Sequence, residues 1–99
     1  MALQVEIHFP VTADDEWIDD VGDFMIDLED ELGIEESEDG EEFGDAYVFF
    51  ITGGNERKLL AAASRVATRA GVPAGAFAMV TTTDAPRVGM GRRVNLPVR

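Results

Sequence analysis

Three kinds of side chain in this sequence could carry out acid–base or nucleophilic chemistry: one histidine, two serines and twenty carboxylates. His8 is the natural proton shuttle near neutral pH, but it lies on the polar phase of an alternating segment and is predicted at the surface. Ser37 and Ser64 lie in an acidic segment and in a predicted helix, whereas a serine nucleophile needs a sharp turn. No pair of carboxylates can be singled out as acid and base among so many. We therefore expect no catalytic residues, and a protein that is not an enzyme.

Two segments resemble ligand-binding loops without completing the pattern. From Glu35 to Ala46 the chain is acidic with Gly40 at the sixth position, as in a calcium loop, but the twelfth position is alanine instead of a bidentate glutamate. We therefore expect a solvated acidic loop, with weak calcium binding as the alternative. Gly53–Asn55 precedes a predicted helix without the lysine of a phosphate loop. The absence of cysteine excludes a disulfide and a thiolate zinc site, and with no complete binding motif we expect no metal and no cofactor.

The charges of the chain are separated along the sequence. Residues 1–46 contain eighteen Asp and Glu and no Lys or Arg, whereas residues 47–99 contain eight Lys and Arg and only two acids. The two halves thus carry about -18 and +6, which sum to the net charge of -12. Such a field attracts basic proteins and repels phosphates. We expect a basic protein partner and no direct nucleic-acid binding, although an acidic surface that only keeps the protein dissolved is the alternative.

The carboxylates of the first predicted helix repel one another. Five pairs of them stand four residues apart, with no basic residue on that helix, at a cost of about 1 to 2.5 kcal/mol at low salt. Arginines of the second predicted helix and of the C-terminal segment, or a basic partner, could compensate them. The predicted partner-binding residues are Asp19, Asp20, Asp23, Asp27, Glu31, Glu35, Glu36, Glu38, Asp39, Glu41 and Glu42.

Hydrophobic periodicity predicts the elements that position these acids. Residues 3–9 alternate as a strand, and apolar residues spaced by three and four predict a helix from the Thr12 cap to Leu32, with its core stripe at Trp17 and Phe24. The segment 34–44 is either a loop or a short edge strand near 34–37, turned at Asp39-Gly40 or at Gly44-Asp45. The remaining predicted elements are a strand at 47–52, a helix at 55–70, and strands at 77–82 and 93–96.

This order of elements predicts a single α+β domain over residues 1–99. It is the order of a ferredoxin-like split βαβ fold, an antiparallel sheet with two helices on one face and an extra C-terminal strand. Phe49 and Phe50 should point to opposite sheet faces, so the face away from the helices is partly apolar and needs a cover. No segment is apolar enough to span a membrane and no signal peptide is recognisable, so we expect a cytoplasmic protein.

The segment Asp39-Gly40-Glu41-Glu42-Phe43-Gly44-Asp45, together with the strand after it and the Gly75-Ala76-Phe77 turn, resembles a family of small uncharacterised bacterial proteins. In that family a D-G-x-E-x-G segment precedes an apolar strand. The resemblance implies a ferredoxin-like fold and no established activity. Some small acidic proteins of this general look are immunity partners of secreted toxins. Our leading hypothesis is thus a non-catalytic acidic module that inhibits a basic partner. The alternative is a homodimeric regulatory or small-ligand-binding domain that uses the open sheet face.

Overall fold

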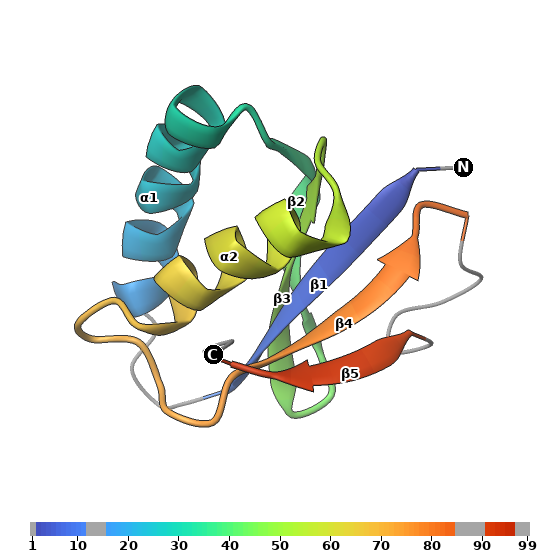
Figure 1. Ribbon diagram of the computed structural model, residues 1–99. Coiled ribbons are helices and arrows are strands. Elements are labelled where there is room, and N and C mark those ends of the chain that lie inside the picture. The colour runs from blue at the N-terminus through green and yellow to red at the C-terminus, as the bar shows by residue number, and fades with distance from the viewer. Residues whose placement is uncertain (1, 12–15, 85–90, 97–99) are drawn as a thin grey trace.

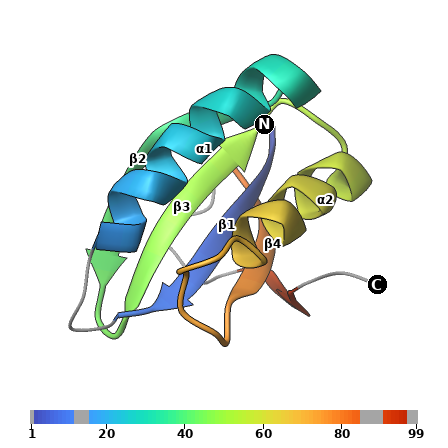
Figure 2. The ribbon, with the colours of Figure 1, turned by 90° about the vertical axis from the view of Figure 1, so that its left-hand side faces the viewer.

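A computed structural model describes residues 2–11, 16–84 and 91–96, with the backbone alone at 37–39. The chain is an α+β protein in which two helices lie on one face of an antiparallel sheet (Figures 1 and 2). Neither described helix is long and apolar enough to cross a membrane. The elements are β1 (Leu3–Pro10), α1 (Glu16–Leu32), β2 (Glu35–Phe43), β3 (Ala46–Thr52), α2 (Glu56–Ala67), β4 (Phe77–Thr82) and β5 (Arg92–Asn95).

The sheet has the strand order β2-β3-β1-β4-β5 among the described residues, and every neighbouring pair is antiparallel. β1 is the central strand, while β2 and β5 are the two edges. Figure 2 shows α1 crossing the side of the sheet formed by β2 and β3, with α2 over β1 and β4. The acidic helix and the acidic edge strand β2 therefore lie on the same side of the molecule.

The core lies between the two helices and the sheet. The alternation of β1 places Val5, Ile7 and Phe9 on the helix side, where all three are fully buried. Phe9 contacts the ring of Trp17 at 5.0 Å between centroids and the ring of Phe49 at 5.9 Å. The predicted apolar stripe of α1 is confirmed in part. Trp17, Val21, Met25 and Leu28 are buried, whereas Phe24, predicted in the core, is half-buried and packs against its edge.

The strand predicted near residues 34–37, after α1, was too short. β2 extends from Glu35 to Phe43 and pairs with β3, and the chain turns at Gly44-Asp45 and not at Asp39-Gly40. The Oη of Tyr47 donates a hydrogen bond of 3.0 Å to the carbonyl of Gly40, and a Cβ at Gly40 would lie only 2.7 Å from the Tyr47 ring. Gly40 therefore makes room for an aromatic ring in an irregular strand, which is not the conformation of a calcium loop.

Several other boundaries differ slightly from prediction. α2 ends at Ala67, before the predicted residue 70, and the hydroxyl of its C-cap Thr68 donates to carbonyls of the last turn, at 2.9 Å to Ser64 and 3.3 Å to Arg65. β5 begins one residue earlier than predicted, at Arg92, and Pro10 still belongs to β1. The predicted Thr12 cap of α1 lies outside the described residues.

The sheet face away from the helices is less open than predicted. Phe49 and Phe50 do point to opposite faces, because only Phe49 belongs to the core cluster, but Phe50 is also buried, at 2% exposure. The ring of Phe43 packs edge-on against it, with centroids 6.2 Å apart. Val48 and Met79 on the same face are buried as well. The apolar centre of this face is thus covered within the chain itself.

The acidic surface as the candidate functional site

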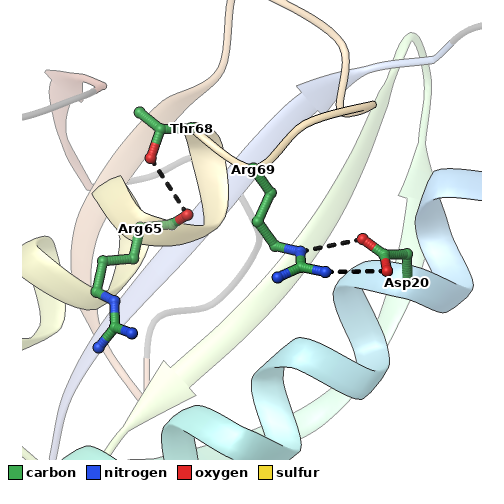
Figure 3. A network of polar contacts seen from close by, with 4 residues as sticks. All are labelled: Asp20, Arg65, Thr68 and Arg69. Atoms are coloured by element: carbon green, nitrogen blue, oxygen red, sulfur yellow. Dashed lines mark hydrogen bonds and ion pairs between the residues drawn. The ribbon is translucent and has the colours of Figure 1, made fainter.

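The flank of α1 that faces α2 holds carboxylates neutralised by the chain's own arginines. Arg69 donates two hydrogen bonds of 3.0 Å to the two carboxylate oxygens of Asp20 (Figure 3). These bonds hold the pKa of Asp20 below its ordinary value and raise the pKa of Arg69. The guanidinium of Arg69 also lies 4.2 Å from the centre of the Phe24 ring, which fixes it over α1.

A second bridge repeats this arrangement near the C-terminal end of α1. An Arg65 nitrogen lies 3.1 Å from a Glu31 oxygen, and the Arg65 guanidinium stands 5.8 Å from the centre of the Phe24 ring. Phe24 is therefore approached by two arginines, Arg65 in α2 and Arg69 two residues beyond its end. The Asp27 charge also acts on Arg69. Two residues of the predicted partner-binding set, Asp20 and Glu31, are thus already paired within the chain. Compensation by the chain's own arginines was one of the two possibilities that the sequence allowed.

The outer flank of α1 differs, because its carboxylates have no such partners. Asp19 and Asp23 are exposed and make no ion pair or side-chain hydrogen bond with any residue that the structure describes. Asp30, which the sequence reasoning missed, is exposed in the same way. The two arginines that contact α1 within the described residues, Arg65 and Arg69, are on the other flank. The outer flank therefore keeps its negative potential in the folded protein.

The edge strand β2 continues this negative surface. Glu35, Glu41 and Glu42 are exposed, and Glu36 is half-buried, with its backbone N–H donating a bond of 3.1 Å to Oε1 of Glu29 on α1. That bond connects the helix to the edge strand, so the two acidic elements are joined directly. The side chains of Glu38 and Asp39 lie outside the described part. Acids along an edge strand also discourage pairing with another strand.

The structure corrects the prediction for His8. His8 is 7% exposed and its Nε2 lies 2.9 Å from Oε1 of Glu6, which is 1% exposed. The ring of His8 stacks on Phe77 at 4.7 Å, and the guanidinium of Arg93 lies 4.0 Å from the centre of Phe77 on β4. Sequence alternation correctly placed both polar residues on the face away from the helices but could not show that this face is covered. A buried, satisfied pair of this kind supports the sheet more readily than it supports catalysis.

A small hollow lies where α1 begins and the chain leaves α2. It has a volume of about 300 Å³ and is lined by Glu16, Trp17, Asp20, Ala70 and Gly71. The Asp20 oxygens in it already accept the bonds from Arg69, and Trp17 is almost fully buried. Within the described residues, no group of three or more His, Cys, Asp or Glu is placed to hold a metal ion.

Comparison with known proteins adds no relative to this picture. No protein-family model matches the chain, and neither a curated protein nor a solved structure matches it.

Proposed function

We propose that this chain is a non-catalytic acidic module that binds a basic protein, in the manner of an immunity-type inhibitor whose carboxylates occupy a cationic cleft of its target. One observation carries the proposal. Arg65 of α2 and Arg69, just beyond its end, bind Glu31 and Asp20 on one flank of α1. Asp19 and Asp23 on the other flank have no cationic partner among the described residues. A surface of this kind gains most from an external cation, because its like charges still repel one another.

The arrangement of strands supports the fold that we infer for this module, a ferredoxin-like split βαβ with one added strand. In the order β2-β3-β1-β4, β1 lies between β3 and β4, and β3 lies between β2 and β1. Each helix thus connects two strands separated by one antiparallel neighbour, with β5 appended beyond β4. Because this fold carries many unrelated activities, it adds nothing to the choice of function. A cytoplasmic location belongs to the same proposal, since a chain without cysteine needs no oxidising compartment.

The alternative, a homodimer through the sheet face away from the helices, has less support. The apolar residues that such an interface needs, Val48, Phe50 and Met79, are buried within the single chain. Among the described large apolar side chains near that face, only Phe43 is exposed to a notable degree. Light scattering separates the two proposals, because the inhibitor proposal expects a monomer at all measurable concentrations.

The experiment compares two variants with equal net charge. Asp23→Lys/Asp27→Lys reverses the acidic flanks of α1, whereas Glu56→Lys/Asp84→Lys reverses the only two acids outside the first 46 residues. Each changes the net charge from -12 to -8. Binding to cytochrome c, a basic probe protein, is measured by calorimetry at low ionic strength. We expect the first variant to lose about tenfold in affinity, and the second less than about twofold.

The salt dependence gives the second readout. At about 150 mM salt the Debye length is about 8 Å, so wild-type affinity should fall while the difference between the variants narrows. Equal losses in the two variants would mean that only net charge matters, which contradicts the proposal. Circular dichroism of both variants checks that the helices remain folded.

A further inference from the structure

The outer flank of α1 carries an apolar residue among its carboxylates. Ile26 is 59% exposed, more than any other large hydrophobic side chain in the described part of the chain. Asp23 precedes it by three residues and Asp30 follows it by four, so both share its face of the helix. Both aspartates are exposed. An exposed isoleucine beside unpaired carboxylates is a surface on which an apolar anchor and charge recognition coincide.

Gly22 stands four residues before Ile26 on the same face, inside a helix of 17 residues. A glycine in a helix interior costs about 1 kcal/mol relative to alanine. Its φ is not positive, and an added Cβ would meet no atom within 4 Å, so neither the backbone nor a neighbour in the described chain requires glycine there. The glycine instead leaves a gap in the helix surface beside Ile26, which a closely approaching partner can occupy.

We propose that the shallow groove left along α1 where Gly22 lacks a side chain, bordered by Ile26 and Asp30, is the docking site for a basic amphipathic helix of the partner protein, an inference that rests on the proposed function. Residues spaced by four form the ridges and grooves in which two helices pack. The missing side chain at Gly22 lets the backbone of the partner helix come near. Ile26 then packs between the apolar residues of the partner helix. Lysines or arginines beside that stripe meet Asp19, Asp23 and Asp30.

The charge of the surface selects this occupant over a second copy of the same chain. Two copies packed through this row would bring their aspartates face to face with no arginine between them, because Arg65 and Arg69 are held on the other flank. A strand from another protein would instead pair along β2, where the acids oppose it. A cationic amphipathic helix is the occupant that matches both Ile26 and the aspartates around it.

The test uses two synthetic peptides made of leucine and lysine in equal composition. In the first, the leucines recur every three and four residues, so that the helix is amphipathic; in the second their order is scrambled. Binding of each peptide to the full chain is measured by calorimetry, and the contact surface is mapped by NMR amide shifts. We expect the amphipathic peptide to bind about tenfold more tightly than the scrambled one and to shift the resonances around Gly22 and Ile26.

Three variants locate the groove. Ile26→Ser should reduce the affinity for the amphipathic peptide about tenfold and leave that for the scrambled peptide unchanged. Gly22→Leu fills the groove and should weaken the same peptide while circular dichroism shows the helix intact. Val11→Ser, at another exposed apolar residue outside the helices, is the matched control and should change neither affinity.

The outcomes separate this inference from the function on which it depends. If both peptides bind equally and Asp23→Lys/Asp27→Lys weakens both, the acidic surface binds cations without a groove, and only the inference fails. Amide shifts confined to β2 would also contradict docking at the groove on α1. If neither peptide binds the wild-type protein at low salt, the groove and the proposed function fail together.

Discussion

Arg69 and Asp20 are joined by two parallel hydrogen bonds of 3.0 Å, although 49 positions separate them in the sequence. This bidentate pair connects the C-terminal end of α2 to the first turns of α1. It also shows that the fold neutralises some of its own acidic charge. The remaining acids of α1 are thereby divided into a flank that is satisfied inside the molecule and a flank that is not.

The pair predicts a pH dependence of stability. Since the folded pKa of Asp20 lies below its ordinary value, the unfolded chain binds the proton more readily, and the stabilisation is complete above the unfolded pKa and lost as the pH falls through the folded pKa. Wild-type protein should therefore lose thermal stability from about pH 5 downward more steeply than Asp20→Asn does. Thermal unfolding followed by circular dichroism across this range measures the difference.

The control for this prediction is Asp23→Asn, which removes one charge from α1 but breaks no described bond. Its melting temperature at neutral pH should stay at or above that of the wild type, since it relieves repulsion, whereas Asp20→Asn should lower it. Parallel acid profiles for wild type and Asp20→Asn would show that the pair contributes nothing to folding.

The buried Glu6 and His8 pair predicts a loss of stability when one partner is removed. In His8→Ala the Glu6 carboxylate stays buried without its imidazole, and the stacking on Phe77 is lost. We expect a decrease of about 1 to 3 kcal/mol in the free energy of unfolding, measured by urea titration. Asn95→Ala, an exposed change on β5, should stay within about 0.5 kcal/mol. A similar small effect for His8→Ala would mean that the pair is not structural.

The sequence predicted best what local periodicity encodes. The stripe of α1 is visible because Trp17, Val21 and Leu28 repeat at helical spacing, and β3 is visible as a run of β-branched and aromatic residues. It predicted least well the features that depend on contacts between segments far apart in the sequence. The length of β2 was missed because acids rarely favour strands, and only pairing with β3 and the Tyr47 bond to Gly40 extend it.

The same limit applies to the candidate site. Runs of Asp and Glu revealed the acidic surface, but which of them are paired depends on how α2 packs against α1, and so Asp20 and Glu31 could not be told from Asp19 and Asp23. The exposure of Ile26 was readable in principle, since it lies off the buried stripe of its helix. The burial of His8 was not, because alternation assigns a face and not what covers it.

The packing around Phe9 predicts which core substitution is most damaging. Phe9 is fully buried and contacts the rings of both Trp17 and Phe49. Phe9→Ala should destabilise by about 3 to 5 kcal/mol, and the milder Phe9→Leu by about 1 to 2 kcal/mol. Trp17 is the only tryptophan of the chain, so its fluorescence reports unfolding directly. If Phe9→Leu unfolded at the wild-type urea concentration, Phe9 would not be a central core residue.

Two glycines predict opposite effects of the same substitution. Gly53 has a φ of 94°, and an added Cβ would lie 3.2 Å from the Glu35 nitrogen and 3.3 Å from the Ile34 Cα, so Gly53→Ala strains the turn between β3 and α2 and should cost about 1 to 3 kcal/mol. Gly22→Ala meets no atom within 4 Å in a regular helix and should stabilise by up to about 1 kcal/mol. Urea titration of both variants measures the signs. A destabilising Gly22→Ala would show that the fold itself needs this glycine, and would remove the reason to seek its explanation in a partner.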